Sequence, residues 1–133
     1  LSQGIDTAQM IKVISKCAGT SWMFENRAPH VADGDYAPYS AVNIWLKDLG
    51  IVLDAAKGSQ FSAPLAAVAL QQFVAAAGMG FSTEGDAAVA KVYAQNAGLK
   101  LPKSCLLIIP KGSKNSLLSK SGCPEKFLGN LLA

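Results

Sequence analysis

The chain has 133 residues, which is enough for one domain with a modest hydrophobic core. Half of the residues are apolar, which excludes an intrinsically disordered chain. Aromatic residues make up only 8% and alanine is abundant, so packed helices are favoured over a β-sandwich. The net charge of +3 is not gathered in an arginine-rich cluster, and we therefore expect no nucleic-acid partner.

The first helix is expected to begin at Asp6 or Thr7, because either side chain can cap it, and to end at Gly19. Residues 20–40 follow, rich in proline, glycine, aspartate and asparagine. Apolar periodicity in this stretch is limited to one turn around Trp22–Asn26. We therefore predict a long ordered loop here, with only short helical pieces, and long loops in compact domains are often functional.

Two longer helices are predicted in the middle of the chain. The first covers residues 40–57 and ends at Gly58, with polar and apolar side chains on opposite faces. The second begins after Ser62, has Pro64 in its first turn and runs to Gly78. Its many alanines allow close approach of another backbone, so we expect this helix to be central in the fold.

A last helix is predicted from the Thr83-x-x-Asp86 pattern, which resembles a capping box, through Asn96, with Gly98 as its stop. No convincing alternating strand appears before residue 104. The pattern over residues 6–98 therefore predicts an all-α fold with four main helices and no sheet of more than two strands.

Cysteine usage and hydropathy suggest an intracellular setting. Cys17, Cys105 and Cys123 form no CxxC pair and have no metal-ligand spacing, so we interpret them as reduced thiols. No secretory signal pattern is visible. The longest uncharged run, residues 58–83, is mostly alanine and is too weakly apolar for a membrane span. We expect the cytoplasm or another intracellular compartment, and no membrane partner.

Catalytic and metal-binding patterns are sparse. His30 is the only histidine, and no serine or cysteine stands beside it at a recognised spacing, so a loop-packing or surface role is favoured over catalysis. Asp33 and Asp35 flank Gly34, but the other ligands of a calcium loop are missing. We interpret these acids as turn-stabilising residues and expect no metal site.

The pair Lys47–Asp48 is the one candidate for a functional site. Every helical neighbour of Asp48 three or four positions away is apolar: Ile44, Trp45, Ile51 and Val52. Such an acid needs a partner if it is buried. Either the pair is structural and faces solvent, or Lys47 holds an anion in a groove where Gly50, one turn later, leaves room for a ligand.

Two long stretches carry a resemblance to a known family. They read "SWMFENRAPHVADGDYAPYSAVNIWLKDLGIVLDAA" and "FSAPLAAVALQQFVAAAGMGFSTEGDAAVAKVY". Their order of features resembles the C-terminal helical domain of the β-hydroxyacid dehydrogenases, which include 3-hydroxyisobutyrate dehydrogenase and, in closer resemblance, L-threonate dehydrogenase. The resemblance extends from about residue 4 to residue 98, while residues 104–133 do not match it.

The resemblance implies an all-α bundle of the 6-phosphogluconate dehydrogenase C-terminal-domain-like fold. Residues 1–103 would form this helical domain without its first long interdomain helix, and 104–133 would be an unassigned tail. The complete enzyme would use NAD or NADP, pair this domain with a Rossmann domain, and assemble as a homo-oligomer through it. The dinucleotide fingerprint and the family's catalytic lysine are both absent, so we expect no catalytic residue in this chain and no NAD(P) binding by it alone.

For the site, the resemblance implies that Lys47 reaches towards cofactor and substrate in the cleft between two domains. Asp48 and Ser40 would help to build the wall of that cleft. The sequence thus supports two hypotheses. The chain is either a substrate-domain fragment of a hydroxyacid dehydrogenase, or a non-enzymatic helical module that assembles with itself or with a full-length relative.

Overall fold

The structure is a computed structural model that describes residues 1–103. Within this range it contains helices and no strand, apart from an isolated antiparallel bridge between Ala41 and Gly85. The all-α prediction is therefore confirmed. The elements are α1 (Thr7–Ile14), α2 (Trp22–Asp33), α3 (Val42–Gly58), α4 (Pro64–Ala76), the π-helical turn η1 (Ala77–Phe81), the 3-10 helix η2 (Asp86–Val89) and α5 (Ala90–Asn96).

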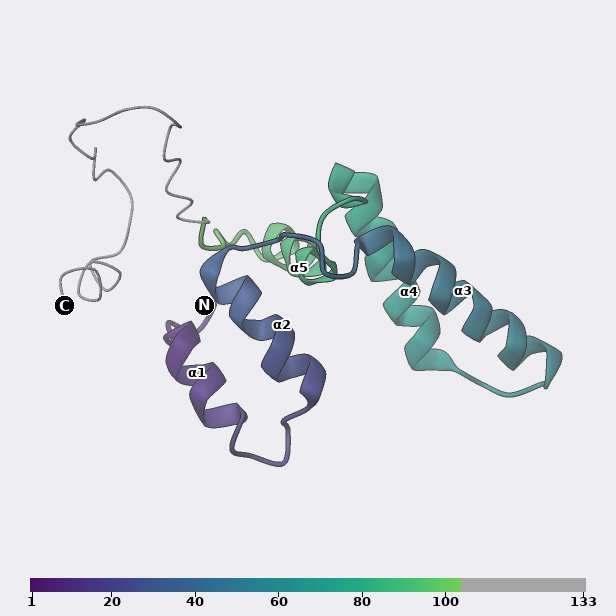
Figure 1. The fold of residues 1–133 in the computed structure, drawn as a ribbon, viewed down its shortest axis with the longest axis horizontal. Helices are drawn as coiled ribbons and strands as arrows, with labels where there is room; N and C mark the ends of the chain where they lie inside the picture. Colours follow the sequence, from purple (N-terminus) through teal and green to yellow (C-terminus); the bar gives the residue numbers. More distant parts are fainter. Residues whose placement is uncertain (104–133) are drawn as a thin grey trace.

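The helices form two hairpins, with the last helical segment between them (Figure 1). Helices α1 and α2 lie side by side at one end, and α3 and α4 form a longer arm at the other. The short helix η2 contacts α2, α3, α4 and α5, although it has only four residues. It therefore connects the two hairpins.

Local sequence signals explain several of the helix boundaries. The Asp6 carboxylate accepts a hydrogen bond from the Gln9 backbone N–H at 2.8 Å and caps α1, as predicted. Pro64 occupies the first turn of α4, where its missing N–H costs nothing. Gly98 has a φ of 62° and follows α5, which confirms the predicted stop.

The prediction of a loop over residues 20–40 is wrong for its first half, because α2 occupies Trp22–Asp33. The Ser21 hydroxyl caps this helix by accepting from the Phe24 N–H at 3.0 Å, and Gly34 ends it in the left-handed conformation. Pro29 lies inside the helix and interrupts the sequence pattern. Its missing N–H removes one backbone hydrogen bond of the helix, while Ser21 and Gly34 mark the two ends.

The buried core surrounds η2 and the start of α5. The prediction that α4 is central is wrong, because most of α4 lies outside this core. The buried cluster consists of Val42, Ala76, Ala88 and Val92. Only the last residue of α4 belongs to it, whereas Leu65 in the first turn of α4 is 85% exposed. Helix α4 packs along α3, but its opposite face, with Leu65, Val68 and Val74, is exposed among residues 1–103.

The predicted capping box at Thr83 and Asp86 does not form. Gly85 precedes η2 as its N-cap without a side-chain hydrogen bond, and Asp86 turns inward instead. Gly85 is buried so closely against residues 36 and 37 that a Cβ atom would stand 2.8 Å from the Ala37 carbonyl oxygen. The residue at this position must therefore be glycine for the two segments to pack as they do.

Candidate functional site

Lys47 and Asp48 form an ion pair on the surface of α3. Their Nζ and Oδ1 atoms are 3.0 Å apart, and their side chains are 69% and 50% exposed. Neighbouring apolar residues on this flank, Ile44, Ile51 and Val52, are exposed as well. Among residues 1–103 Asp48 is therefore not buried, and the apolar flank on which it lies is exposed. Its burial in a complete enzyme stays a prediction.

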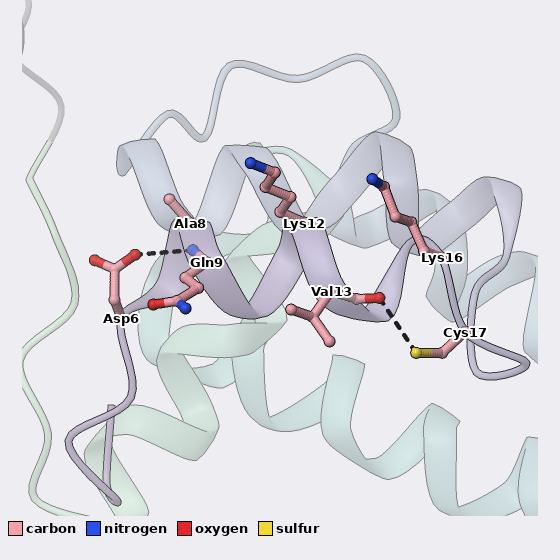
Figure 2. Close-up of a pocket in the computed structure, with 7 residues that line it drawn as sticks. All are labelled: Asp6, Ala8, Gln9, Lys12, Val13, Lys16 and Cys17. Carbon is pink, nitrogen blue, oxygen red and sulfur yellow. Dashed lines mark hydrogen bonds between the residues drawn. The ribbon is translucent and has the colours of Figure 1, made fainter.

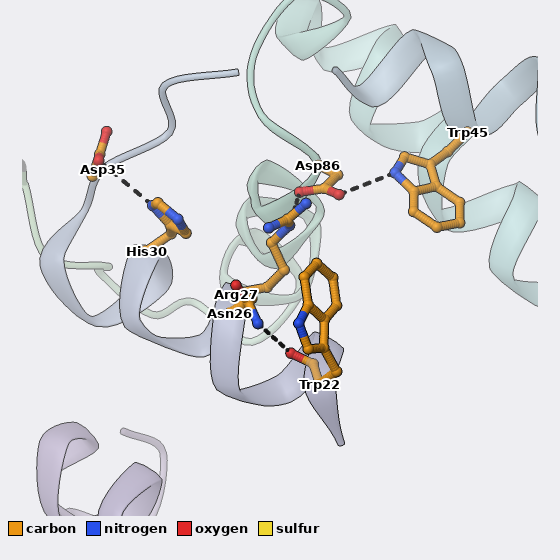
Figure 3. A network of polar contacts seen from close by, with 7 residues as sticks. All are labelled: Trp22, Asn26, Arg27, His30, Asp35, Trp45 and Asp86. Carbon is orange, nitrogen blue, oxygen red and sulfur yellow. Dashed lines mark hydrogen bonds and ion pairs between the residues drawn. The ribbon is translucent and has the colours of Figure 1, made fainter. Parts of the chain in front are cut away.

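A second polar cluster, the Arg27–Asp86–Trp45 network, lies inside the fold (Figure 3). Asp86 is the buried charged residue at its centre, with 5% of its surface exposed. The Arg27 Nε–H donates to Oδ1 at 2.7 Å and the Trp45 indole N–H donates to Oδ2 at 3.2 Å. Each carboxylate oxygen thus has its own donor, which offsets the cost of burying the charge.

Aromatic rings support both donors of this network. The guanidinium carbon of Arg27 is 5.9 Å from the centre of the Trp22 ring, in a cation–π arrangement. The Trp45 ring stacks on Phe73 of α4 with a centroid distance of 5.5 Å and an interplanar angle of 12°. Helices α2, α3 and α4 therefore all contribute side chains around Asp86.

Ser40, predicted in the cleft wall, lies beside this network through its backbone. The Asp86 N–H donates to the Ser40 carbonyl at 2.7 Å, and the Gly85 N–H donates to Tyr36 at 2.9 Å. Two bonds run in the other direction, from Val42 N–H to Glu84 and from Asn43 N–H to Ser82. The first N–H groups of α3 are thus capped by backbone carbonyls, since no side chain caps this helix.

Glu84, Lys91, Tyr36 and Phe81 form a further polar contact near the core. The Lys91 ammonium bonds to Glu84 and lies 4.2 Å from the Tyr36 ring centre and 4.5 Å from that of Phe81. Burial of the Tyr36 phenol, with a further contribution from the Glu84 charge, raises the pKa of Tyr36 above its usual value. Tyr36 is therefore a neutral phenol at physiological pH.

His30 lies in α2 and pairs with Asp35, with a distance of 3.5 Å between Nδ1 and Oδ2. Its ring also contacts Tyr39 at 5.2 Å, and no hydroxyl or thiol of residues 1–103 is hydrogen-bonded to it. Asp35 accepts from the Ala37 N–H at 3.0 Å, which confirms its turn-stabilising role. Asp33 is exposed at the end of α2.

A groove of about 680 Å³ runs along α1 (Figure 2). It is lined by Asp6, Ala8, Gln9, Lys12, Val13, Lys16 and Cys17. Lys12 and Lys16 extend from one side of the helix, while the Cys17 thiol bonds back to the Val13 carbonyl at 3.3 Å. Helix α1 and the residues directly flanking it supply this lining, which includes none of the predicted site residues, so the groove is not the candidate site. Cys105 and Cys123 fall outside the described residues.

The segment Pro64–Phe81 is long and apolar enough to cross a membrane by length and composition, with a mean hydropathy of 1.4. The prediction that this run is too weakly apolar to span a membrane is therefore wrong by this criterion, although one such helix is weak evidence of a span. The backbone of Gly80, with a φ of 89°, departs from helical geometry within the segment.

The similarity of this chain to known proteins identifies its family. Residues 2–93 match the family described as NAD-binding of NADP-dependent 3-hydroxyisobutyrate dehydrogenase. The chain belongs to this family. NAD(P) is the cofactor of this family. The match confirms the resemblance to the β-hydroxyacid dehydrogenases that the sequence shows.

Individual members of the family are similar over the same region. The L-threonate dehydrogenase of Cupriavidus necator is 49% identical over 102 residues, which cover 77% of this chain and 33% of that protein. The enzyme of that name from Escherichia coli K12 is 50% identical over 99 residues, 74% of this chain and 32% of that protein. The crystal structure of a 3-hydroxyisobutyrate dehydrogenase from Salmonella typhimurium superposes with a TM-score of 0.66 at 51% identity, covering 68% of this chain and 32% of that one.

The chain thus spans about a third of the length of these relatives. Among residues 1–103, Lys47 and Gly50 are the residues that fit a contact to an anionic dinucleotide. Lys47 offers an accessible ammonium, and Gly50 beside it has no atom within 4 Å of its Cβ position. These residues fit a contact to a phosphate or carboxylate, while the remaining contacts of a dinucleotide site would come from elsewhere.

The Arg27–Asp86–Trp45 network does not follow from the sequence pattern. Trp45 stands there as an apolar neighbour of Asp48, and the Thr83-x-x-Asp86 pattern predicts a local capping role for Asp86. Arg27 belongs to the "FENR" stretch, but no role followed from it. One signal was available: Asp86 is the single acid in the apolar stretch "DAAVA", where an unpaired carboxylate would be costly to bury.

Proposed function

We propose that this chain acts as the helical substrate and dimerisation domain of an NAD(P)-dependent β-hydroxyacid dehydrogenase of the L-threonate or 3-hydroxyisobutyrate type. The observation that carries the proposal is the 49% identity over 102 residues to an L-threonate dehydrogenase, together with the family match over residues 2–93. The parent enzyme would oxidise the hydroxyl of a hydroxyacid, with NAD(P) as the hydride acceptor. The partner of this domain would be a dinucleotide-binding Rossmann domain.

In this proposal Lys47 provides positive charge for the cleft between the two domains. Its side chain is free to reach a ligand, because the ion pair with Asp48 is solvent-exposed and therefore weak. Asp48 and Ser40 would belong to the wall of the cleft. The general acid/base would come from the complete enzyme, since none of the residues assigned here performs proton transfer. Such chemistry fits the cytoplasm or another intracellular compartment.

A chimeric enzyme tests the proposal. The full chain of 133 residues would replace the matched third of the Cupriavidus necator L-threonate dehydrogenase, behind that enzyme's own upstream sequence. We expect the chimera to reduce NAD or NADP with L-threonate or 3-hydroxyisobutyrate, and the chain alone to show no turnover, because most dinucleotide contacts lie in a Rossmann domain. Absorbance of the reduced cofactor at fixed protein concentration measures both.

The control for this experiment is the upstream part of the relative without any helical domain. Activity of that part alone would show that the helical domain is not needed. A folded chimera without activity on either substrate would contradict the proposed dehydrogenase role, and turnover by the isolated chain would contradict its dependence on a second domain.

A second candidate function is favoured by the exposed apolar surface of the α3–α4 arm. Phe61, Leu65 and Val68 are all exposed, and a shallow hollow of about 470 Å³ lies beside Phe61. Exposed apolar patches of this kind mark association surfaces. The chain would then be a non-enzymatic helical module that pairs with a second copy of itself or with a full-length relative.

Sedimentation of the isolated chain tests this second function. We expect a dimer, and we expect Leu65→Glu to convert it to a monomer, because a charge at this 85% exposed position opposes burial. Gln95→Glu, at an exposed position of α5 outside the α3–α4 arm, is the control for the added charge. A monomer in the unmodified chain would refute the self-assembling module.

A further inference from the structure

The Arg27–Asp86–Trp45 network is buried and polar, and the proposed function assigns no role to it. Its central carboxylate accepts one hydrogen bond from α2 and one from α3. Trp45 and Lys47 are both on α3, two positions apart and therefore about 200° apart around the helix axis. The side of α3 that is fixed inside the fold is thus opposite to the side that presents Lys47.

We infer that Trp45, held by Asp86 and Arg27, is a positioning residue that sets the rotation of α3 and thereby the direction of the Lys47 ammonium. The inference rests on the proposed function, in which Lys47 meets an anionic group of the cofactor or substrate. The network would then contribute to ligand binding as well as to the stability of the fold.

Two contacts at right angles hold the Trp45 ring. Its face stacks on Phe73 of α4, and its edge donates to Asp86 of η2. A ring held only by its face can slide along Phe73, whereas the indole hydrogen bond fixes its position in the plane of the stack. This hydrogen bond therefore restrains the rotation of α3 about its own axis, in addition to the packing of α3 against α4.

The start of α3 is held by the packing of Val42, which is fully buried, but no side chain forms a hydrogen bond there. Its N-cap residue, Ala41, makes no capping hydrogen bond, and the first N–H groups bond to the Glu84 and Ser82 carbonyls. These backbone bonds hold the end of the helix in place. Since they lie close to the axis at the first turn, they constrain its rotation less than a side chain that extends from the helix surface.

A double-mutant cycle in the chimeric dehydrogenase tests the inference. Trp45→Phe keeps the stack on Phe73 and removes the indole donor, and we expect it to lower kcat/KM about fivefold, mainly through KM for the ligand that Lys47 contacts. In a Lys47→Ala background the same Trp45→Phe change is expected to have almost no effect. This dependence on Lys47 is the readout that a purely structural role would not produce.

Lys57→Ala is the control background, because Lys57 is an exposed lysine in the last turn of the same helix. There Trp45→Phe should keep its full effect. Equal losses in the Lys47→Ala and unmodified backgrounds would overturn the positioning role. If Lys47→Ala alone leaves kcat/KM unchanged, the proposed function of Lys47 fails and the inference falls with it, a result distinct from the first. Should Trp45→Phe prevent folding, Asp86→Asn, which keeps the side-chain volume, replaces it in the cycle.

Discussion

Asp86→Ala is expected to cost the domain about 3 kcal/mol of unfolding free energy, at the lower end for breaking a buried ion pair. The substitution leaves the Arg27 guanidinium and the Trp45 N–H without their shared acceptor. We choose the lower end because the Arg27 side chain is 21% exposed and can regain some hydration. A domain of this size has roughly 5–15 kcal/mol of total stability, so the loss is a large fraction.

Thermal denaturation followed by far-ultraviolet circular dichroism measures this loss, and we expect a melting temperature lower by roughly 10–20 °C. Asp54→Ala on the exposed side of α3 is the matched control, with an expected change within about 0.5 kcal/mol. Asp86→Asn should lie between the two, because its amide oxygen still accepts from one donor. Equal melting of the Asp86→Ala and Asp54→Ala variants would show that the network contributes little to stability.

Lys47→Ala in the chimeric enzyme is expected to lower kcat/KM by about 10- to 100-fold, the range for losing a charge-assisted hydrogen bond to an anionic ligand. The fold should be unaffected, because the side chain is exposed and alanine favours helix. Steady-state kinetics with both substrates, together with a melting curve, provide the measurement. Lys57→Ala, at the other end of α3, should leave the kinetics unchanged. Unchanged kcat/KM in Lys47→Ala would remove the assignment of Lys47 to the site.

Asp48→Ala provides a comparison between the free and the assembled domain. In the isolated chain its loss should cost no more than about 0.5 kcal/mol, as the exposed pair with Lys47 is weak. In the chimera the same change is expected to cost about 1–3 kcal/mol if a second domain buries the carboxylate. Equal costs in both proteins would mean that Asp48 faces solvent in the assembled enzyme too.

The parts of the fold that could be predicted from the sequence are those with local causes. The starts of α1 and α4 follow from Asp6 and Pro64, and the end of α5 follows from Gly98. Helix α2 was missed because Pro29 breaks the local pattern, while the caps that stabilise the helix are at its two ends. A prediction from short-range periodicity ends the helix at such a proline, although the helix continues through it.

The site was predictable only in part, because its geometry depends on contacts between distant segments. The position of Lys47 on an exposed helix face followed from the spacing of polar residues. The pairing of Asp86 with Arg27 joins residues 59 positions apart, and no local rule selects that partner over a neighbouring N–H group. Burial of Asp48 in the complete enzyme would likewise require contact with another domain, which the local sequence does not specify.

The capping of α3 by main-chain carbonyls has a consequence for how this region tolerates sequence change. A serine or aspartate cap is lost when that one side chain is replaced, but the carbonyls of Ser82 and Glu84 remain whatever side chains these residues bear. The loop can therefore change its side chains at surface positions without loosening the start of the helix. Only the glycine at position 85 is fixed, by its contact with the Ala37 carbonyl.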